Sequence, residues 1–233
     1  MDKKEKTNMV YPIVIAHRGG GKIYGDNTLK SIQHSISIGV TYIEIDVRKT
    51  KDNVIILYHN SWIQYKHDII YIHDMTYEDI YNIKDNICRL DEVLKYISTQ
   101  QYTDICINID IKEEGMIDDI NKIIYEYTQN KHVNFVYTSF LHTEILNIRH
   151  KYDNVQYGMI FDIYDIELDT RDDINIIILN IDSIDSRTID KIKQKQKQVW
   201  LYTVNTETDI KLALDLHVDG IITDVPDLFI GFV

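Results

Sequence analysis

The feature that most constrains the fold is the alternation of short apolar runs with stretches of helical periodicity along the whole chain. Runs such as "IIIL" are apolar on both strand faces, which is typical of a parallel sheet covered by helices. Between the runs, apolar residues recur at three- and four-residue spacing, as at Leu29, Ile32 and Ile36. Thr76 and Asp79 form the pattern of a capping box, which predicts that a helix begins there. The strand candidates are residues 12–17, 41–48, 54–59, 104–112, 133–139, 155–161, 174–181, 198–204 and 218–224.

This alternation predicts an α/β fold, and specifically a (β/α)8 TIM barrel in a single domain, since about eight strand–helix units fit the chain length. No linker, repeat or low-complexity segment divides the 233 residues. We expect residues 1–11 to form an N-terminal tail and residues 12–233 to form the barrel, with a small extra strand at 54–59 after the second barrel strand. An open, doubly wound sheet is the alternative, and the alternation by itself does not distinguish the two.

Composition restricts the partners and the compartment. The formal net charge is −12 without a block of Lys and Arg, so we do not expect binding to nucleic acid or to an anionic membrane surface. The sequence has no run of 18 apolar residues, and its charged N-terminus lacks the apolar core of a signal peptide. We therefore expect a cytoplasmic protein without a transmembrane segment. The abundance of Ile and Tyr fits an AT-rich source genome, such as that of a large DNA virus.

Polar residues interrupt two of the apolar strands on one face. Glu44 and Asp46 are two residues apart in "YIEIDVR", and Asn108, Asp110 and Lys112 share a face in "INIDIK". Either strand alone could be half-exposed, with its polar face in water. In a parallel barrel neither face is wet, so these carboxylates must be paired or must coordinate a cation. Three carboxylates form an all-oxygen ligand set, which Mg²⁺ and Ca²⁺ prefer.

Two histidines each end a strand candidate. His17 follows "PIVIA" and His59 follows "VIILY". Both are expected at the rim where the carboxyl ends of the strands meet, which is where barrel enzymes carry their chemistry. A pair of imidazoles suits proton transfer near neutral pH.

The motifs that contain these residues resemble a known family. "IAHRGG…DNTLKSIQHSISIGVTYIEIDVRKTKDNVIILYHN" resembles the opening of glycerophosphodiester phosphodiesterases, with an HRG motif, an ENT-like motif, an E-x-D pair and a histidine after the next strand. The resemblance continues through "INIDIK", "YTSF", "YTVNTETD" and "DGIITDVP", and it covers most of the chain. It implies a (β/α)8 barrel that hydrolyses small phosphodiesters to glycerol 3-phosphate and an alcohol with the help of a divalent cation.

The resemblance also implies a role for each matching residue. Glu44, Asp46 and Asp110 match the metal ligands, although the family has a glutamate at the position of Asp110. His17 and His59 match the catalytic acid–base pair, with His17 expected as the base and His59 as the acid.

The remaining matches concern the substrate. Arg18 and Lys112 match the phosphate contacts, and Tyr202 stands where the family has a tryptophan before T-V-N, so we expect it to bind substrate. Two further positions depart from the family pattern. Asp26 replaces the glutamate of the ENT motif, and Asn60 replaces the aspartate that usually follows the second histidine.

Several alternatives stay open at this point. The departures would also suit a barrel that serves as a binding or regulatory module, and an aspartate as third ligand is also found in the related phospholipase D-type toxins, which would favour a lysophospholipid substrate. Trp62 and Tyr65 would either line a pocket for an alcohol or lipid tail, or belong to a packed hairpin. Gly20 and Gly21 would either form a phosphate-binding nest or let the loop turn away from the rim.

Overall fold

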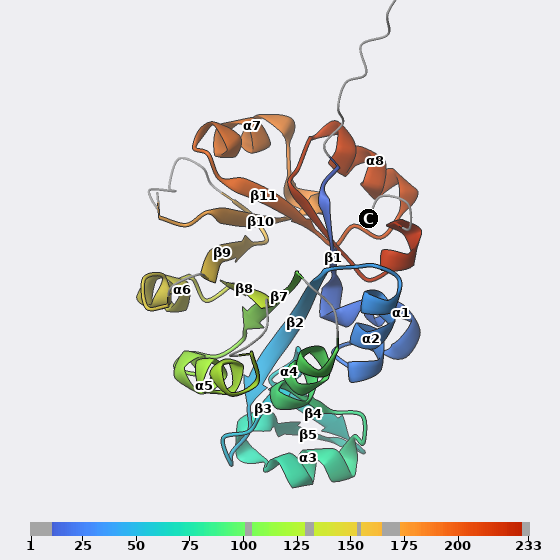
Figure 1. The fold of residues 1–233 in the computed structure, drawn as a ribbon, viewed down its shortest axis with the longest axis vertical. Helices are drawn as coiled ribbons and strands as arrows, with labels where there is room; N and C mark the ends of the chain where they lie inside the picture. Colours follow the sequence, from blue (N-terminus) through green and yellow to red (C-terminus); the bar gives the residue numbers. More distant parts are fainter. Residues whose placement is uncertain (1–10, 101–103, 129–132, 153–154, 165–172, 230–233) are drawn as a thin grey trace, which may run out of the picture.

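The computed structural model describes residues 11–100, 104–128, 133–152, 155–164 and 173–229. Within them, eight parallel strands form a closed barrel with helices around its outside (Figure 1). The ring closes where β1 pairs with both β12 and β2, which places Ile15 opposite Ile222 and Tyr42. Closure confirms the barrel and excludes the open sheet. In ring order the strands are β1 (Ile13–Ala16), β12 (Gly220–Thr223), β11 (Gln198–Tyr202), β10 (Ile176–Asn180), β9 (Val155–Phe161), β8 (Val133–Ser139), β7 (Ile105–Ile111) and β2 (Tyr42–Lys49).

The helices follow the periodic stretches, and several begin at side-chain caps. The Thr28 side chain accepts a hydrogen bond from the Ser31 backbone N–H at the start of α2, and Thr76 and Asp79 form the predicted capping box of α3. The helices are α1 (Gly21–Tyr24), α2 (Leu29–Ser37), α3 (Tyr77–Ile83), α4 (Leu90–Thr99), α5 (Ile117–Thr128), α6 (His142–Ile148), α7 (Ser186–Gln194) and α8 (Glu207–Asp215). None of the helices in the described part of the chain has the length and apolar character needed to cross a bilayer.

The barrel interior is a packed apolar core below a polar rim. Its buried cluster is Ile15, Cys106, Val136, Ile160, Ile176, Ile178, Trp200 and Ile222. Trp200 is fully buried, and Gly220 on the next strand makes room for it, since a Cβ at that glycine would lie 2.7 Å from the indole Cδ1. The outward-facing side chains of β2, such as Ile43 and Ile45, pack in the larger cluster that includes helix residues. Because apolar side chains fill the interior, the polar side chains of the barrel lie at the end where the carboxyl ends of the strands meet.

One insertion leaves the barrel between β2 and β7 (Figure 1). β3 (Ile55–Leu57) pairs antiparallel with β2, which confirms the extra strand, and β6 (Cys88–Arg89) pairs with β3. β4 (Trp62–Tyr65) and β5 (Asp68–Tyr71) form a separate hairpin. Trp62 and Tyr65 belong to this hairpin and are 36% and 40% exposed, and neither lines the pocket described below. The pocket-lining alternative for these two residues is therefore not supported.

Candidate active site

A cavity of about 270 Å³ opens at the carboxyl ends of the barrel strands. The polar strand-end positions converge there because parallel strands all end at the same rim. Every residue that the sequence singles out for the site lines this cavity, namely His17, Arg18, Glu44, Asp46, His59, Asp110, Lys112 and Tyr202.

The three carboxylates come together because β2 and β7 are neighbours in register. Asp46 lies opposite Asp110, and Glu44 lies opposite Asn108, so both strands turn their polar positions into the barrel. One oxygen from each of Glu44, Asp46 and Asp110 lies within 4.8 Å of the others, and all three residues are buried. This arrangement confirms that the acids on the two strands share one site.

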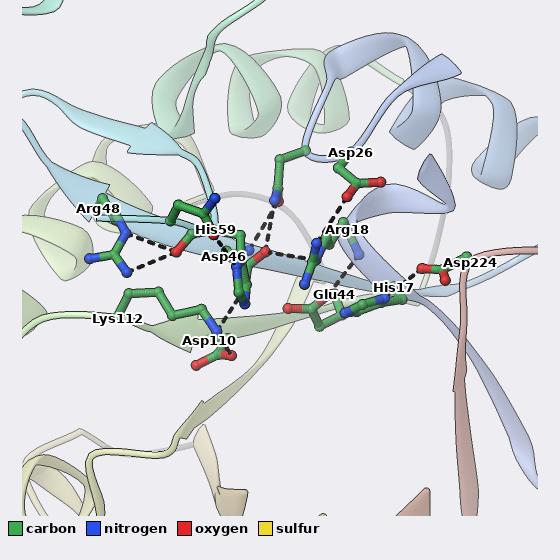
Figure 2. A network of polar contacts seen from close by, with 12 residues as sticks. His17, Arg18, Asp26, Glu44, Asp46, Arg48, His59, Asp110, Lys112 and Asp224 are labelled. Carbon is green, nitrogen blue, oxygen red and sulfur yellow. Dashed lines mark hydrogen bonds and ion pairs between the residues drawn. The ribbon is translucent and has the colours of Figure 1, made fainter. Parts of the chain in front are cut away.

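A chain of ion pairs and hydrogen bonds links the carboxylates, as Figure 2 shows. Lys112 Nζ lies 2.5 Å from Asp110 Oδ2 and 2.9 Å from Asp46 Oδ1. Arg18 Nε lies 3.3 Å from Asp46 Oδ2 as an ion pair without hydrogen-bond geometry, and Asn27 Nδ2 donates to the same oxygen at 2.8 Å. Burial raises the pKa of Asp46, but the charges of Lys112 and Arg18 outweigh burial and hold this pKa below its usual value.

The other two acids carry charge that the protein does not fully compensate. Burial, followed by the charge of Asp46, raises the pKa of Glu44 to about 8. Burial raises the pKa of Asp110 to about 6 despite the neighbouring Lys112. Asp110 Oδ1 is buried without a hydrogen-bond partner. A buried carboxylate oxygen that lacks a partner, beside two further carboxylates, is the donor set of a hard divalent cation, so these residues fit such an ion.

Arg18 reaches the site from a strained turn after β1. Its backbone lies in the left-handed region, at φ 51° and ψ 36°, a conformation that costs a non-glycine residue about 1 kcal/mol or more. This conformation directs the Arg18 N–H to Glu44 Oε2 at 2.7 Å, while the guanidinium Nη1 donates to Asp26 Oδ2 at 2.9 Å. The strained backbone thus orients the Arg18 N–H and guanidinium toward the acids.

The glycines that follow Arg18 serve close packing. A Cβ on Gly19 would lie 2.7 Å from Ser31 Oγ, and one on Gly20 would lie 2.8 Å from Pro226 Cγ. None of Gly19, Gly20 and Gly21 lines the cavity. The glycine loop therefore turns away from the rim and packs on α2 and on the segment after β12, and the alternative of a phosphate nest is not supported.

His17 is held by a carboxylate from the last barrel strand. Its Nδ1 lies 2.6 Å from Asp224 Oδ1 (Figure 2). Asn205 Nδ2 donates to Asp224 Oδ2 at 2.7 Å. With Nδ1 engaged by Asp224, the other ring nitrogen, Nε2, is left for the cavity. Burial lowers the pKa of His17, but the Asp224 hydrogen bond and the charge of Glu44 outweigh burial and raise this pKa above its usual value.

His59 is positioned through its backbone. Arg48 donates from Nε and Nη2 to the His59 carbonyl oxygen, at 2.9 and 2.8 Å, and its Nη1 donates to Glu113 at 2.8 Å. The ring Nδ1 lies 2.9 Å from Asn60 Oδ1. Burial lowers the pKa of His59 and outweighs the charge of Asp46 and the Asn60 hydrogen bond, which raise it. The two imidazoles thus differ in the direction of their pKa shifts.

The opposite wall of the cavity carries apolar and aromatic side chains. Ile160 of β9 and Ile178 of β10 form its lower part, with Phe140 and Tyr202 toward the rim. The Tyr202 hydroxyl lies 2.8 Å from Asp162 Oδ1 and 3.1 Å from the Phe161 carbonyl oxygen. This wall faces the charged one across the space that a ligand would fill.

Sequence reasoning missed four polar residues of the site. Asn205 and Asp224 lie in "TVN" and "TDVP", motifs that were matched to the family without a role. Asn27 lies in the ENT-like motif and pairs with Asp46 through both its amide nitrogen and its carbonyl oxygen. Asp162 is a polar residue directly after the buried strand "VQYGMIF". That strand-end position is the same signal that identified His17, and it could have identified Asp162.

Known proteins share both the sequence pattern and the fold. The model of the Glycerophosphoryl diester phosphodiesterase family matches residues 17–228. A glycerophosphodiester phosphodiesterase of Caldanaerobacter subterraneus is 24% identical over 241 residues, which cover 95% of this chain and 97% of that protein. The structure of a glycerophosphodiester phosphodiesterase from Thermotoga maritima superposes with a TM-score of 0.74 at 21% identity, covering 96% of this chain and 99% of that chain. A phosphodiesterase of Oleispira antarctica, solved in complex with the product sn-glycerol-3-phosphate, gives a TM-score of 0.79 at 18% identity and covers 94% and 95% of the two chains.

Proposed function

The chain belongs to the glycerophosphoryl diester phosphodiesterase family, and from this premise we propose that it hydrolyses glycerophosphodiesters to glycerol 3-phosphate and an alcohol. The observation that carries the proposal is the convergence, in one cavity, of three carboxylates, two histidines and two basic side chains. A cavity of about 270 Å³ suits a small diester.

The carboxylates Glu44, Asp46 and Asp110 would hold a divalent cation, Mg²⁺ or Ca²⁺, and the partnerless Asp110 Oδ1 supports this role. A cation bound there neutralises charge on the phosphodiester and lowers the barrier to attack at phosphorus. Lys112 and Arg18 add two permanent positive charges beside the same space. Burial lowers the pKa of Lys112, but the charges of Asp110 and Asp46 outweigh burial and raise this pKa, so the side chain stays protonated.

His17 and His59 would transfer the protons of the reaction. The raised pKa of His17 favours its protonated form, which suits the acid that protonates the leaving alkoxide. The lowered pKa of His59 favours its neutral form, which suits the base that deprotonates the nucleophile, either water or a neighbouring hydroxyl of the substrate. These directions favour the reverse of the roles expected from the sequence, and we adopt the reversed assignment as part of the proposal.

A substrate panel tests the proposal. Glycerophosphocholine, glycerophosphoethanolamine, lysophosphatidylcholine and single-stranded DNA are each incubated with the protein and either Mg²⁺, Ca²⁺ or EDTA. We expect glycerol 3-phosphate from the two glycerophosphodiesters with a divalent cation and none in EDTA. Absence of hydrolysis with every cation would instead support the binding or regulatory module. Faster cleavage of lysophosphatidylcholine or of DNA would overturn the substrate assignment.

A further inference from the structure

The aromatic wall of the cavity contains one carboxylate, that of Asp162, to which the proposed reaction assigns no role. Asp162 follows β9 directly, two residues after Ile160, and both side chains line the cavity because alternate residues of a strand share a face. The strands β9 and β11 are separated in the barrel by β10. The Tyr202 side chain spans β10 to reach Asp162, and the two residues together form the rim on this side.

Asp162 is not neutralised by a basic side chain in the part of the chain that the structure describes. Its side-chain contact there is the Tyr202 hydroxyl, at 2.8 Å, and it is exposed at the rim. The acids of the opposite wall differ in this respect, because Asp46 and Asp110 contact Lys112 and Asp224 contacts His17. A ligand that enters the cavity therefore meets an uncompensated negative charge on the side away from the proposed cation ligands Glu44, Asp46 and Asp110.

The Tyr202 ring lies beside Asp162, and Phe140 packs on Tyr202 while Lys112 Nζ lies 5.6 Å from the Phe140 ring centroid. Phe140 and Tyr202 meet edge to face, with ring centroids 6.1 Å apart, and both line the cavity. The single proton of the Tyr202 hydroxyl is already shared between Asp162 and the Phe161 carbonyl oxygen, so the tyrosine offers a ligand its ring rather than its hydroxyl proton. A carboxylate beside two aromatic rings attracts a soft organic cation by charge and by cation–π contact.

We propose that Asp162, Phe140 and Tyr202 form a subsite for the alcohol half of the substrate and that this subsite selects alcohols bearing an ammonium group, such as choline or ethanolamine. The proposal rests on the proposed function, since it concerns the group that leaves from the same phosphodiester. A polyol such as glycerol would instead need several hydrogen-bond donors and acceptors, and besides Asp162 and Thr203 this wall offers the two rings, Ile160 and Ile178.

The test compares two substrates that release the same product. Glycerophosphocholine and glycerophosphoglycerol both yield glycerol 3-phosphate, so a single assay measures kcat/KM for a cationic and for a neutral alcohol. The variant is Asp162→Asn, which removes the charge but keeps an oxygen that accepts the Tyr202 hydrogen bond. Asp182→Asn is the matched control, because Asp182 lies just after β10 at the same end of the barrel but does not line the cavity.

We expect Asp162→Asn to lower the ratio of kcat/KM for glycerophosphocholine to that for glycerophosphoglycerol by about fivefold, the scale of a partly exposed ion pair with cation–π support. The change should fall on KM, because the ammonium is bound alike before and during the reaction. Asp182→Asn should leave the ratio unchanged. An unchanged ratio would overturn the proposal, and if kcat/KM fell equally on both substrates, Asp162 would be assigned to the shared glycerophosphate half.

A binding measurement separates this proposal from the proposed function. If the wild-type protein hydrolyses neither diester, the proposed function fails, and the binding of tetramethylammonium, followed by NMR line broadening, still decides the subsite. Weaker binding to Asp162→Asn than to the wild type and to Asp182→Asn would support the subsite. Equal binding to all three proteins would refute it.

Discussion

The two walls of the cavity lie on the same barrel rim, but their side chains are held in place by different interactions. The wall formed by β1, β2 and β7 gathers buried acids and bases that are linked into one network. The wall formed by β9, β10 and β11 is apolar at its base and aromatic at its rim, with Asp162 as its negative group. Each side chain of the first wall depends on its neighbours for charge compensation. In the second wall, Ile160 and Ile178 are held by packing, and Tyr202 is held by hydrogen bonds to Asp162 and to the Phe161 carbonyl oxygen, without an ion pair.

This contrast indicates that the two walls suit different parts of the substrate. Buried charges that compensate one another are costly to change, because removing one partner leaves another buried without a counter-charge. Such a wall suits the reacting phosphate, whose charge is the same in every substrate. The aromatic wall can be altered at small cost, which suits the part of the substrate that varies. Substitutions in the two walls should therefore differ in size and in the kinetic constant that they change.

The largest effect is expected for Glu44→Gln in the charged wall. It should abolish binding of the divalent cation and lower kcat by more than about 10³-fold, since the site loses one of its three carboxylates. Cation titration by calorimetry and the diester assay measure the two losses. Full turnover by this variant, or by the wild type in EDTA, would contradict the metal site.

The same variant, Glu44→Gln, should gain thermal stability at high pH although it loses activity. The pKa of Glu44 is raised in the folded protein to about 8, so the unfolded chain loses this proton at lower pH and the wild-type fold loses stability as pH rises from about 4.5 to 8. In EDTA at pH 8, Glu44→Gln should therefore have a higher Tm than the wild type. At pH 4 the two Tm values should converge, and a lower Tm for the variant at pH 8 would contradict the uncompensated charge.

Next in size are His17→Ala and His59→Ala, each expected to lower kcat by about 10²- to 10⁴-fold. A leaving group that needs no proton should separate their roles. With a p-nitrophenyl phosphodiester, His17→Ala should regain most of its activity if His17 is the acid, while His59→Ala should stay impaired. His34→Ala is the control, since His34 also pairs with an aspartate, Asp227, but lies outside the cavity. Rescue of His59→Ala instead would restore the roles expected from the sequence.

A smaller loss, about 10- to 100-fold, is expected for Asp224→Asn, because Asp224 orients His17 without meeting the substrate. The Asp224 hydrogen bond raises the pKa of His17, so the variant should move the basic limb of the kcat profile to lower pH. Asp227→Asn removes the equivalent carboxylate beside His34 and should leave the profile unchanged. A uniform loss at every pH would indicate that Asp224 is structural.

The smallest effect is expected for Tyr202→Phe in the aromatic wall. The variant keeps the ring and loses one hydroxyl, whose hydrogen bond to Asp162 contributes modestly at an exposed rim. KM for glycerophosphocholine should rise about two- to fivefold with kcat nearly unchanged. A loss in kcat comparable to that of the histidine variants would place Tyr202 in the reaction itself and erase the difference between the walls.

The sequence by itself determined the alternation of strands and helices and the shared strand faces of the charged wall. Strand periodicity is local, so the two-residue spacing of Glu44 and Asp46 and of Asp110 and Lys112 already put these side chains on shared faces. Parallel strands end at one rim, and the residues at their ends therefore met as predicted.

The tertiary structure decided the contacts between residues that are distant along the chain. His17 and Asp224 are 207 positions apart, and they meet because β1 pairs with β12 when the barrel closes. The composition of the aromatic wall, Asp162 included, depends on which strands flank β10 in the barrel. The direction of the hairpin that contains Trp62 depends on how the insertion after β3 packs. Local periodicity fixes the face on which a side chain lies, whereas its partner across the cavity is fixed by the order of strands around the ring, which no single stretch of sequence encodes.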